Sequence, residues 1–139
     1  MGLLTSSAMI LVEPPTRLSY TIPGDPVPSQ PAALVNGAVQ RKGRERQRSY
    51  RQRVQLYTRL AVNQYRWHDA EDDVEYHVTL RAYVGNRRTI DCDNIAKSAL
   101  DGIKEVAFPD DRQVVRLVVE KHLDAAKPRL EVEIERIGG

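Results

Sequence analysis

Acidic side chains are concentrated around one short segment of this 139-residue sequence. Asp91 and Asp93 precede a helix-like pattern, Asp101 lies within it, and Asp110 and Asp111 follow it. Carboxylates grouped this closely repel one another and raise their own pKa values unless a cation compensates them. All-oxygen ligation favours Mg²⁺, with Mn²⁺ as a possible substitute, over zinc or copper. The cluster therefore indicates a site for a hard metal ion.

The same acids also have structural interpretations. Aspartate is favoured at helix N-caps and in first turns, which would account for Asp91 and Asp93, and it suits a turn after Pro109. The residues Asp93, Lys97 and Asp101 are spaced four apart and could form a ladder of ion pairs. Structural roles alone do not explain why two acidic pairs bracket one helix.

Basic side chains crowd a different stretch, although the net charge is only +2. Along a helix that starts early, four of them would line one face, because their spacing is i, i+3, i+7 and i+10. That face could be merely solvated or could contact phosphates, and one surface of the molecule is expected to meet a polyanion. The basic residues of the stretch are Arg41, Lys42, Arg44, Arg46, Arg48, Arg51 and Arg53, and a second basic turn contains Arg87 and Arg88.

Several classes of protein are excluded. The single cysteine, Cys92, allows no intramolecular disulfide, so a reducing cytoplasm is expected. No Cys/His cluster has the spacing of a zinc site. No segment is apolar enough to span a membrane. The sequence contains no Gly-rich phosphate loop and no evident Ser/His/Asp or Cys/His pair. We therefore expect neither a membrane partner nor a small-molecule cofactor.

The hydrophobic periodicity predicts four strands and two main helices. The order β-α-β-α-β-β indicates an α+β fold, a two-layer sandwich in which the helices lie beside a small mixed sheet. One domain over residues 17–139 is expected, after a disordered or frayed terminus at residues 1–16. The strands are expected at 17–22, 74–84, about 114–121 and 130–137, and the helices at 44–66 and from Asp91 or Asp93 to just before Pro109, with a loop to about Val39.

Each element has an expected buried face. Even-numbered residues from Val74 to Val84 should face the core, as should Leu130, Val132 and Ile134, with glutamates between them facing out. The first helix is expected to bury the stripe Tyr50, Val54, Tyr57, Ala61 and Tyr65 with Leu56 and Leu60, and the second to bury Ile95, Ala96, Ala99, Leu100, Ile103 and Val106.

A basic helix beside a carboxylate-held metal implies metal-assisted phosphodiester hydrolysis, in which a lysine adds positive charge near the transition state. The sequence thus predicts a nuclease. Two alternatives remain open: a non-catalytic DNA-binding module with a structural acidic cluster, and a metal-dependent enzyme acting on nucleotides. The long basic helix argues against the second, because a small substrate needs no such surface.

This pattern resembles the RusA family of crossover junction endodeoxyribonucleases, which resolve four-way (Holliday) DNA junctions. The matching residues are Asp91, Asp93, Asn94, Lys97, Asp101, Phe108, Asp110, Asp111, Gln113 and Val114, with weaker similarity from about Leu18 to Arg136. The resemblance implies a Mg²⁺-dependent homodimer acting on branched DNA by paired cuts. It also implies that Asp91, Asp93 and Asp111 bind the metal and that Lys97 is catalytic.

Other residues have secondary expected roles. Asn94, Asp101 and Asp110 could support the site, and Phe108 could insert into the junction, although an apolar residue before Pro109 is more often core. DNA contacts are expected from Arg41, Lys42, Arg44, Arg48, Arg51, Arg87 and Arg88. Members of the family often carry a basic segment after the early Pro-Gly turn, where this chain has Ser29 to Leu34, so we expect the contact to have moved to the basic helix.

The spacing of the acids bears on how a site could assemble. An unbroken helix from Asp93 to Ala107 would advance about 21 Å, whereas the four steps back to Asp111 recover at most about 14 Å. Gly102 could end the helix earlier, but Ile103 and Val106 continue the apolar face. Two chains with these helices antiparallel would bring Asp111 of one beside Asp91 and Asp93 of the other, which predicts shared sites.

Overall fold

A computed structural model describes residues 15–29, 34–35, 38–39, 41–67, 74–86 and 90–137. The main elements are β1 (Arg17–Pro23), α2 (Arg41–Gln64), β4 (Glu75–Val84), α3 (Cys92–Ile103), β5 (Val114–Leu123) and β6 (Arg129–Ile137). The predicted β-α-β-α-β-β order is confirmed. Residues 1–14, most of the segment expected to be frayed, lie outside the described residues, as do Arg87 and Arg88 and the side chains of Arg41 and Lys42.

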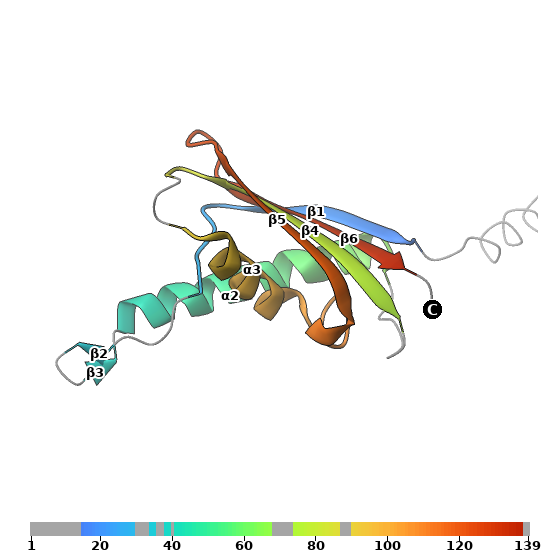
Figure 1. The fold of residues 1–139 in the computed structure, drawn as a ribbon, viewed down its shortest axis with the longest axis horizontal. Coiled ribbons are helices and arrows are strands. Elements are labelled where there is room, and N and C mark those ends of the chain that lie inside the picture. The colour runs from blue at the N-terminus through green and yellow to red at the C-terminus, as the bar shows by residue number, and fades with distance from the viewer. Residues whose placement is uncertain are drawn as a thin grey trace, which may run out of the picture.

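The strands form one mixed sheet in the order β1-β6-β4-β5. β6 is antiparallel to both of its neighbours, whereas β4 and β5 are parallel. A parallel pair requires a crossover connection, and α3 supplies it. Both helices lie on the same side of the sheet (Figure 1). In the described part of the chain, no helix is long and apolar enough to cross a membrane.

One face of the sheet is buried beneath the helices, as the alternation predicted. In β4 every second residue from Tyr76 to Val84 is almost fully buried, and Leu130, Val132 and Ile134 of β6 are buried as well. Val74, which was expected to share this face, precedes β4 and is only partly buried. Glu131, Glu133 and Glu135 alternate with them on the other face and remain partly exposed. The molecule is therefore a two-layer α+β sandwich, as expected.

The prediction for α2 was wrong at its start and along part of its buried stripe. The helix begins at Arg41, and two short paired strands, β2 (Leu34–Val35) and β3 (Ala38–Val39), lie within the expected loop. Tyr50, Val54 and Ala61 are buried, but Leu56, Leu60 and Tyr65 are about half exposed. The cause is that α2 packs through one narrow stripe, and this stripe includes the polar Thr58. Tyr20 of β1 lies 2.6 Å from Thr58 between their hydroxyl oxygens, so that polar group is satisfied.

The second helix ends at Ile103, earlier than the predicted end just before Pro109. The N–H of Lys104 makes the last helical bond, to the carbonyl of Leu100, and the backbone then turns at Glu105, whose φ is 69°. The N–H of Glu105 donates to the carbonyl of Phe108 at 2.7 Å, which closes the turn. Val106 therefore lies outside the helix, and its apolar character did not indicate helix continuation.

The chain between α3 and β5 is held by aromatic packing. The indole N–H of Trp67 donates to the carbonyl of Ala107 at 2.8 Å, and both residues are buried. The Phe108 ring is fully buried, with its centroid 5.1 Å from that of Tyr76. Of its two expected roles, Phe108 thus occupies the core position, and insertion into DNA would require it to leave that core.

Candidate active site

Asp91 and Asp93 lie at the N-terminal end of α3 with exposed side chains. Asp91 occupies the N-cap position, but its side chain makes no capping hydrogen bond. One carboxylate oxygen of Asp93 accepts from the N–H of Asn94 at 3.0 Å. The carbonyl of Asn94 accepts from the N–H of Ser29, which ties the loop after β1 to this end of the helix. Helix capping therefore does not account for an aspartate at position 91, and its carboxylate stays available to a ligand.

Lys97 and Asp101 continue along the exposed face of α3. The ion-pair ladder considered from the sequence does not form: among the residues that the structure describes, no ion pair joins Lys97 to Asp93 or Asp101. Instead, the carboxylate of Asp101 lies 3.9 Å from the ammonium of Lys104. The charge of Lys97 is therefore exposed to an incoming ligand.

Asp110 has a structural role as the N-cap of η2, a short 3-10 helix at Asp111–Gln113. Its carboxylate accepts from the N–H of Arg112 at 2.9 Å, and the side chain of Gln113 accepts from the N–H of Asp110 at 3.0 Å, so the two form a capping box. The hydrogen bonds from Arg112, first the backbone N–H and then the guanidinium, lower the pKa of Asp110. The turn interpretation thus accounts for the geometry of this acid.

Asp111 differs from its neighbour because part of its carboxylate is buried without a partner. Its Oδ1 is buried and accepts no hydrogen bond, while its Oδ2 lies 3.9 Å from the ammonium of Lys104. Burial raises the pKa of Asp111, Lys104 lowers it, and the nearby Asp101 and Asp110 raise it. A cation bound from solution would therefore stabilise the ionised form of Asp111.

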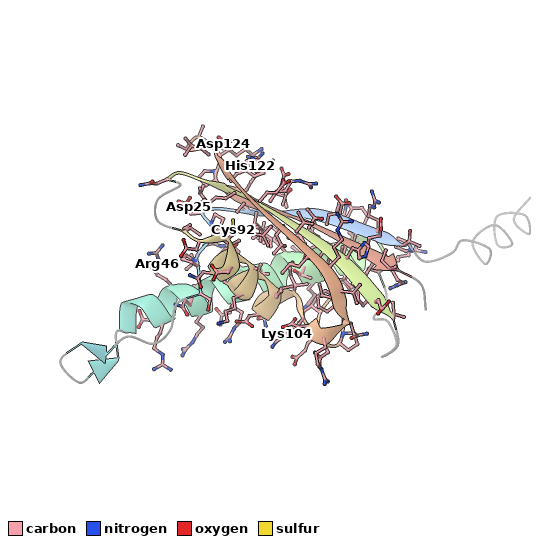
Figure 2. The ribbon with its side chains drawn as sticks, viewed as in Figure 1. Asp25, Arg46, Cys92, Lys104, His122 and Asp124 are labelled. Carbon is pink, nitrogen blue, oxygen red and sulfur yellow. The ribbon has the colours of Figure 1, made fainter. Side chains whose placement is uncertain are left out.

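The three predicted metal ligands are divided between the two ends of α3. Asp111 lies beside Lys104 at the C-terminal end, whereas Asp91 and Asp93 lie at the N-terminal end. Figure 2 shows Cys92 and Lys104 at these opposite ends. From Asp93 to Ile103 the helix advances about 15 Å. Accordingly, the described residues contain no group of three acids, histidines or cysteines that could hold a metal within one chain.

The basic face of α2 lies beside the polar face of α3. Arg44, Arg48 and Arg51 line a cavity of about 190 Å³ together with Ser98 and Asp101 of α3. These arginines are exposed, as expected for contact with a polyanion. Because α2 begins at Arg41, this residue lies on the same helix, about one turn before Arg44. A phosphate backbone on this face would run close to the acids of α3.

Gly102 allows α2 and α3 to approach this closely. A Cβ at Gly102 would lie 2.6 Å from the side chain of Val54 and 3.1 Å from the carbonyl of Arg51. Any side chain there would push the helices apart. The sequence raised Gly102 as an alternative, earlier end of the helix, and the helix does end beside it, at Ile103. Gly102 itself has this packing role.

Two residues of the site were not predicted from the sequence. Lys104 contacts both Asp101 and Asp111, and its position three residues after Asp101 was an available signal. Gln113 was noted only as part of the matching pattern, yet it fixes the turn that carries Asp111. Its side chain both caps Asp110 and donates to the carbonyl of Val74 at 3.0 Å.

Comparison with known proteins agrees with the sequence and the fold. Residues 23–135 match the family model described as Endodeoxyribonuclease RusA, and this match covers most of the chain. Among proteins of curated function, none matches significantly. RusA-family nucleases are metal-dependent and act on DNA junctions. The chain therefore belongs to the RusA family of endodeoxyribonucleases, the Holliday junction resolvases.

Proposed function

We propose that this enzyme uses Mg²⁺, or Mn²⁺ as a substitute, to resolve four-way DNA junctions by paired phosphodiester cuts. Asp91, Asp93 and Asp111 hold the ion, since all three offer the carboxylate oxygens that such ions prefer. No small-molecule cofactor takes part, and residues 17–139 act as one nuclease domain. The single cysteine, Cys92, is exposed and unpaired, which supports a reducing cytoplasm as the place of action.

The state of Asp111 supports this ligand set. Its buried, unpartnered oxygen and its raised pKa are both relieved by a bound cation. The carboxylate of Asp91 is likewise not engaged in capping. When bound, the ion supplies Lewis-acid chemistry, activating water and neutralising charge on the scissile phosphate.

The remaining steps belong to side chains of the two helices. Lys97 lies one turn beyond Asp93 and directs an unpaired ammonium outward, where it stabilises charge that develops on the phosphate. Arg44, Arg48 and Arg51 hold the flanking phosphates and fix the position of the strand. Binding and chemistry are thereby assigned to different residues.

Each site is shared between two chains of a homodimer. The observation that carries this proposal is the separation of Asp111 from Asp91 and Asp93 by the length of α3. The helix need not reach Ala107 for this separation, because a helix that ends at Ile103 still separates them by about 15 Å. Two antiparallel copies of α3 unite the acids in two equivalent sites, which suits symmetric cuts in a junction.

Cleavage assays test the ligand set. Asp91→Asn, Asp93→Asn and Asp111→Asn should each abolish cutting of a mobile four-way junction in Mg²⁺ while junction binding in EDTA persists. Asp110→Asn is the matched control, because asparagine retains the capping function, and it should lose much less activity. Linear duplex and a flap substrate, each with Mg²⁺ or EDTA, measure the preference for junctions. An Asp91→Asn enzyme that cut at the wild-type rate would refute the assignment.

A mixing experiment tests whether sites are shared. Asp91→Asn and Asp111→Asn subunits are each inactive alone, but a heterodimer of the two has one intact shared site. The mixture should therefore nick junctions. If each site belonged to one chain, every site in the mixture would carry a lesion and no activity would return.

A further inference from the structure

β5 is an edge strand of unusually apolar character. It pairs with β4 on one side, and no other described strand pairs with it. Three of its side chains are exposed although they are large and apolar: Val115 at 51%, Leu117 at 41% and Leu123 at 54%. The opposite edge, β1, exposes polar residues such as Ser19 and Thr21 and ends at Pro23, which cannot donate to a ladder. Exposed apolar edges are templates for pairing with another strand.

We propose that β5 is the dimer interface, pairing antiparallel with β5 of a second copy about a two-fold axis at Val118. The proposal rests on the shared-site function above and specifies the surface that builds it. Both copies keep their helices on the same side, because residues directly opposite one another in an antiparallel pair point to the same face. The two sheets then become one continuous sheet.

The sequence of β5 is self-complementary in this register. On the outer face, Arg116 stands opposite Glu120 of the partner subunit, and the symmetry repeats this pair. On the inner face, Leu117 stands opposite Val119 of the partner subunit. Shifting the register by two residues places Leu117 opposite a lysine, or Arg116 opposite a valine, so both alternatives lose the charge pairs. Opposite charges and apolar pairs across strands are the stabilising combinations.

The same register brings the acids together. β5 runs antiparallel to α3, and the ammonium of Lys121 donates to the carbonyl of Ile90 at 2.7 Å, so the end of β5 lies beside the start of α3. In this pairing the partner subunit's β5 begins beside His122, with a register irregularity between Val114 and Arg116. Asp111 of the partner subunit lies in the turn just before that strand and so arrives near Ile90 and Asp91. An interface inferred only from the exposed edge and the charges of β5 thus also completes the proposed metal site.

A second apolar patch serves as the internal control. Leu56 and Leu60 on α2 are 53% and 52% exposed, as much as the residues of β5. They lie four residues apart on a helix face without the self-complementary charges of β5. If exposed apolar area alone drove dimerisation, substitutions at Leu60 and Leu117 would have equal effects.

Sedimentation of the full chain in EDTA, without DNA, tests the interface. Arg116→Glu and Glu120→Arg each create two like-charge pairs in their own homodimer and should weaken it about tenfold or more. A one-to-one mixture of these two variants re-forms both attractive pairs and should restore dimers. Within one chain the two residues lie about 13 Å apart, so restoration cannot come from contact inside the chain. Leu117→Lys should also dissociate the dimer, whereas Leu60→Lys should not.

The outcomes are decisive in either direction. Three results would overturn the interface. The first is that both charge variants remain as dimeric as the wild type, and the second is that a mixture of the folded variants stays monomeric. The third is that the wild-type chain is itself monomeric at about 100 μM. If Glu120→Arg fails to fold by circular dichroism, Leu117→Lys decides: a monomer supports the proposal and a dimer overturns it. If the interface fails while the mixed Asp91→Asn and Asp111→Asn subunits still nick DNA, the shared site stands and dimerisation uses another surface.

Discussion

The ammonium of Lys104 and the carboxylate of Asp111 lie 3.9 Å apart at the C-terminal end of α3. The same ammonium is 3.9 Å from Asp101, so one lysine is divided between two acids. Such half-exposed pairs contribute little to stability. The pair therefore compensates Asp111 only in part, and burial still raises its pKa.

Asp111→Asn should stabilise the metal-free protein at neutral pH. The folded pKa of Asp111 is raised above its ordinary 3.8, so the stability linked to its protonated form is present below that value and is lost as pH rises through the raised pKa. The excess of the variant's Tm over that of the wild type should thus grow from about pH 4 towards neutrality. Thermal melts in EDTA across this range measure it. An advantage that shrank with rising pH would contradict the prediction.

Asp110→Ala should have the opposite effect, because it removes the carboxylate of the capping box. The folded pKa of Asp110 is lowered from 3.8, so its stability is present above that value and lost as pH falls through the lowered pKa. The Tm deficit of the variant should therefore be greatest near neutrality and vanish in acid. Asp110→Asn, which can still cap, should melt close to the wild type.

Lys97→Ala should remove most of the cleavage rate and little stability. Lys97 makes no ion pair in the described part of the chain, so no native pairing is lost, whereas a charge that faces a transition state is worth about a hundredfold or more in rate. Single-turnover cleavage and thermal melts separate the two effects. Lys127→Ala, an exposed lysine in the turn between β5 and β6, is the matched control and should retain activity. A lower Tm with unchanged cleavage would make Lys97 structural.

Replacing Arg44, Arg48 and Arg51 together with glutamine should weaken binding to all DNA. Each lost phosphate contact removes nearly one unit from the slope of log affinity against log salt. Titrations at several salt concentrations give this slope. Arg59→Gln, on the same helix but away from the shared cavity, should change it less than Arg48→Gln alone. An unchanged slope in the triple variant would mean that the basic face of α2 is only solvated.

Gly102→Ala should destabilise the protein by about 1–3 kcal/mol, because the added methyl overlaps Val54 and the backbone of α2. Gly43→Ala is the control within α2, since a Cβ there meets no atom within 4 Å. It should leave stability unchanged or slightly higher. Chemical denaturation measures both. Equal effects of the two substitutions would show that the helices do not need the close approach.

The fold was predictable where periodicity reflects burial on one face. The alternation of β4 and β6 identified their buried residues correctly. Periodicity misled where an apolar side chain was exposed, as at Leu56, or lay beyond a helix end, as at Val106. It also missed Thr58, because a buried hydroxyl has no apolar signal and depends on a distant partner, Tyr20.

The candidate site was predictable in its residue types and only partly in its arrangement. Spacing placed Asp93, Lys97 and Asp101 on one helix face, but local sequence could not say that Lys97 is unpaired while Lys104 takes Asp101. Nor could it distinguish Asp110 from Asp111, since that difference depends on the hydrogen bonds of η2. Tertiary contacts decide both matters.

The division of acids between the ends of α3 has a kinetic consequence. On the shared-site proposal, a lone chain carries two incomplete halves and no competent nuclease. Below the dissociation constant, the amount of active enzyme then rises with the square of the chain concentration. A newly synthesised subunit would be harmless to the genome until it met a second copy, so its abundance would act as a steep threshold for cutting.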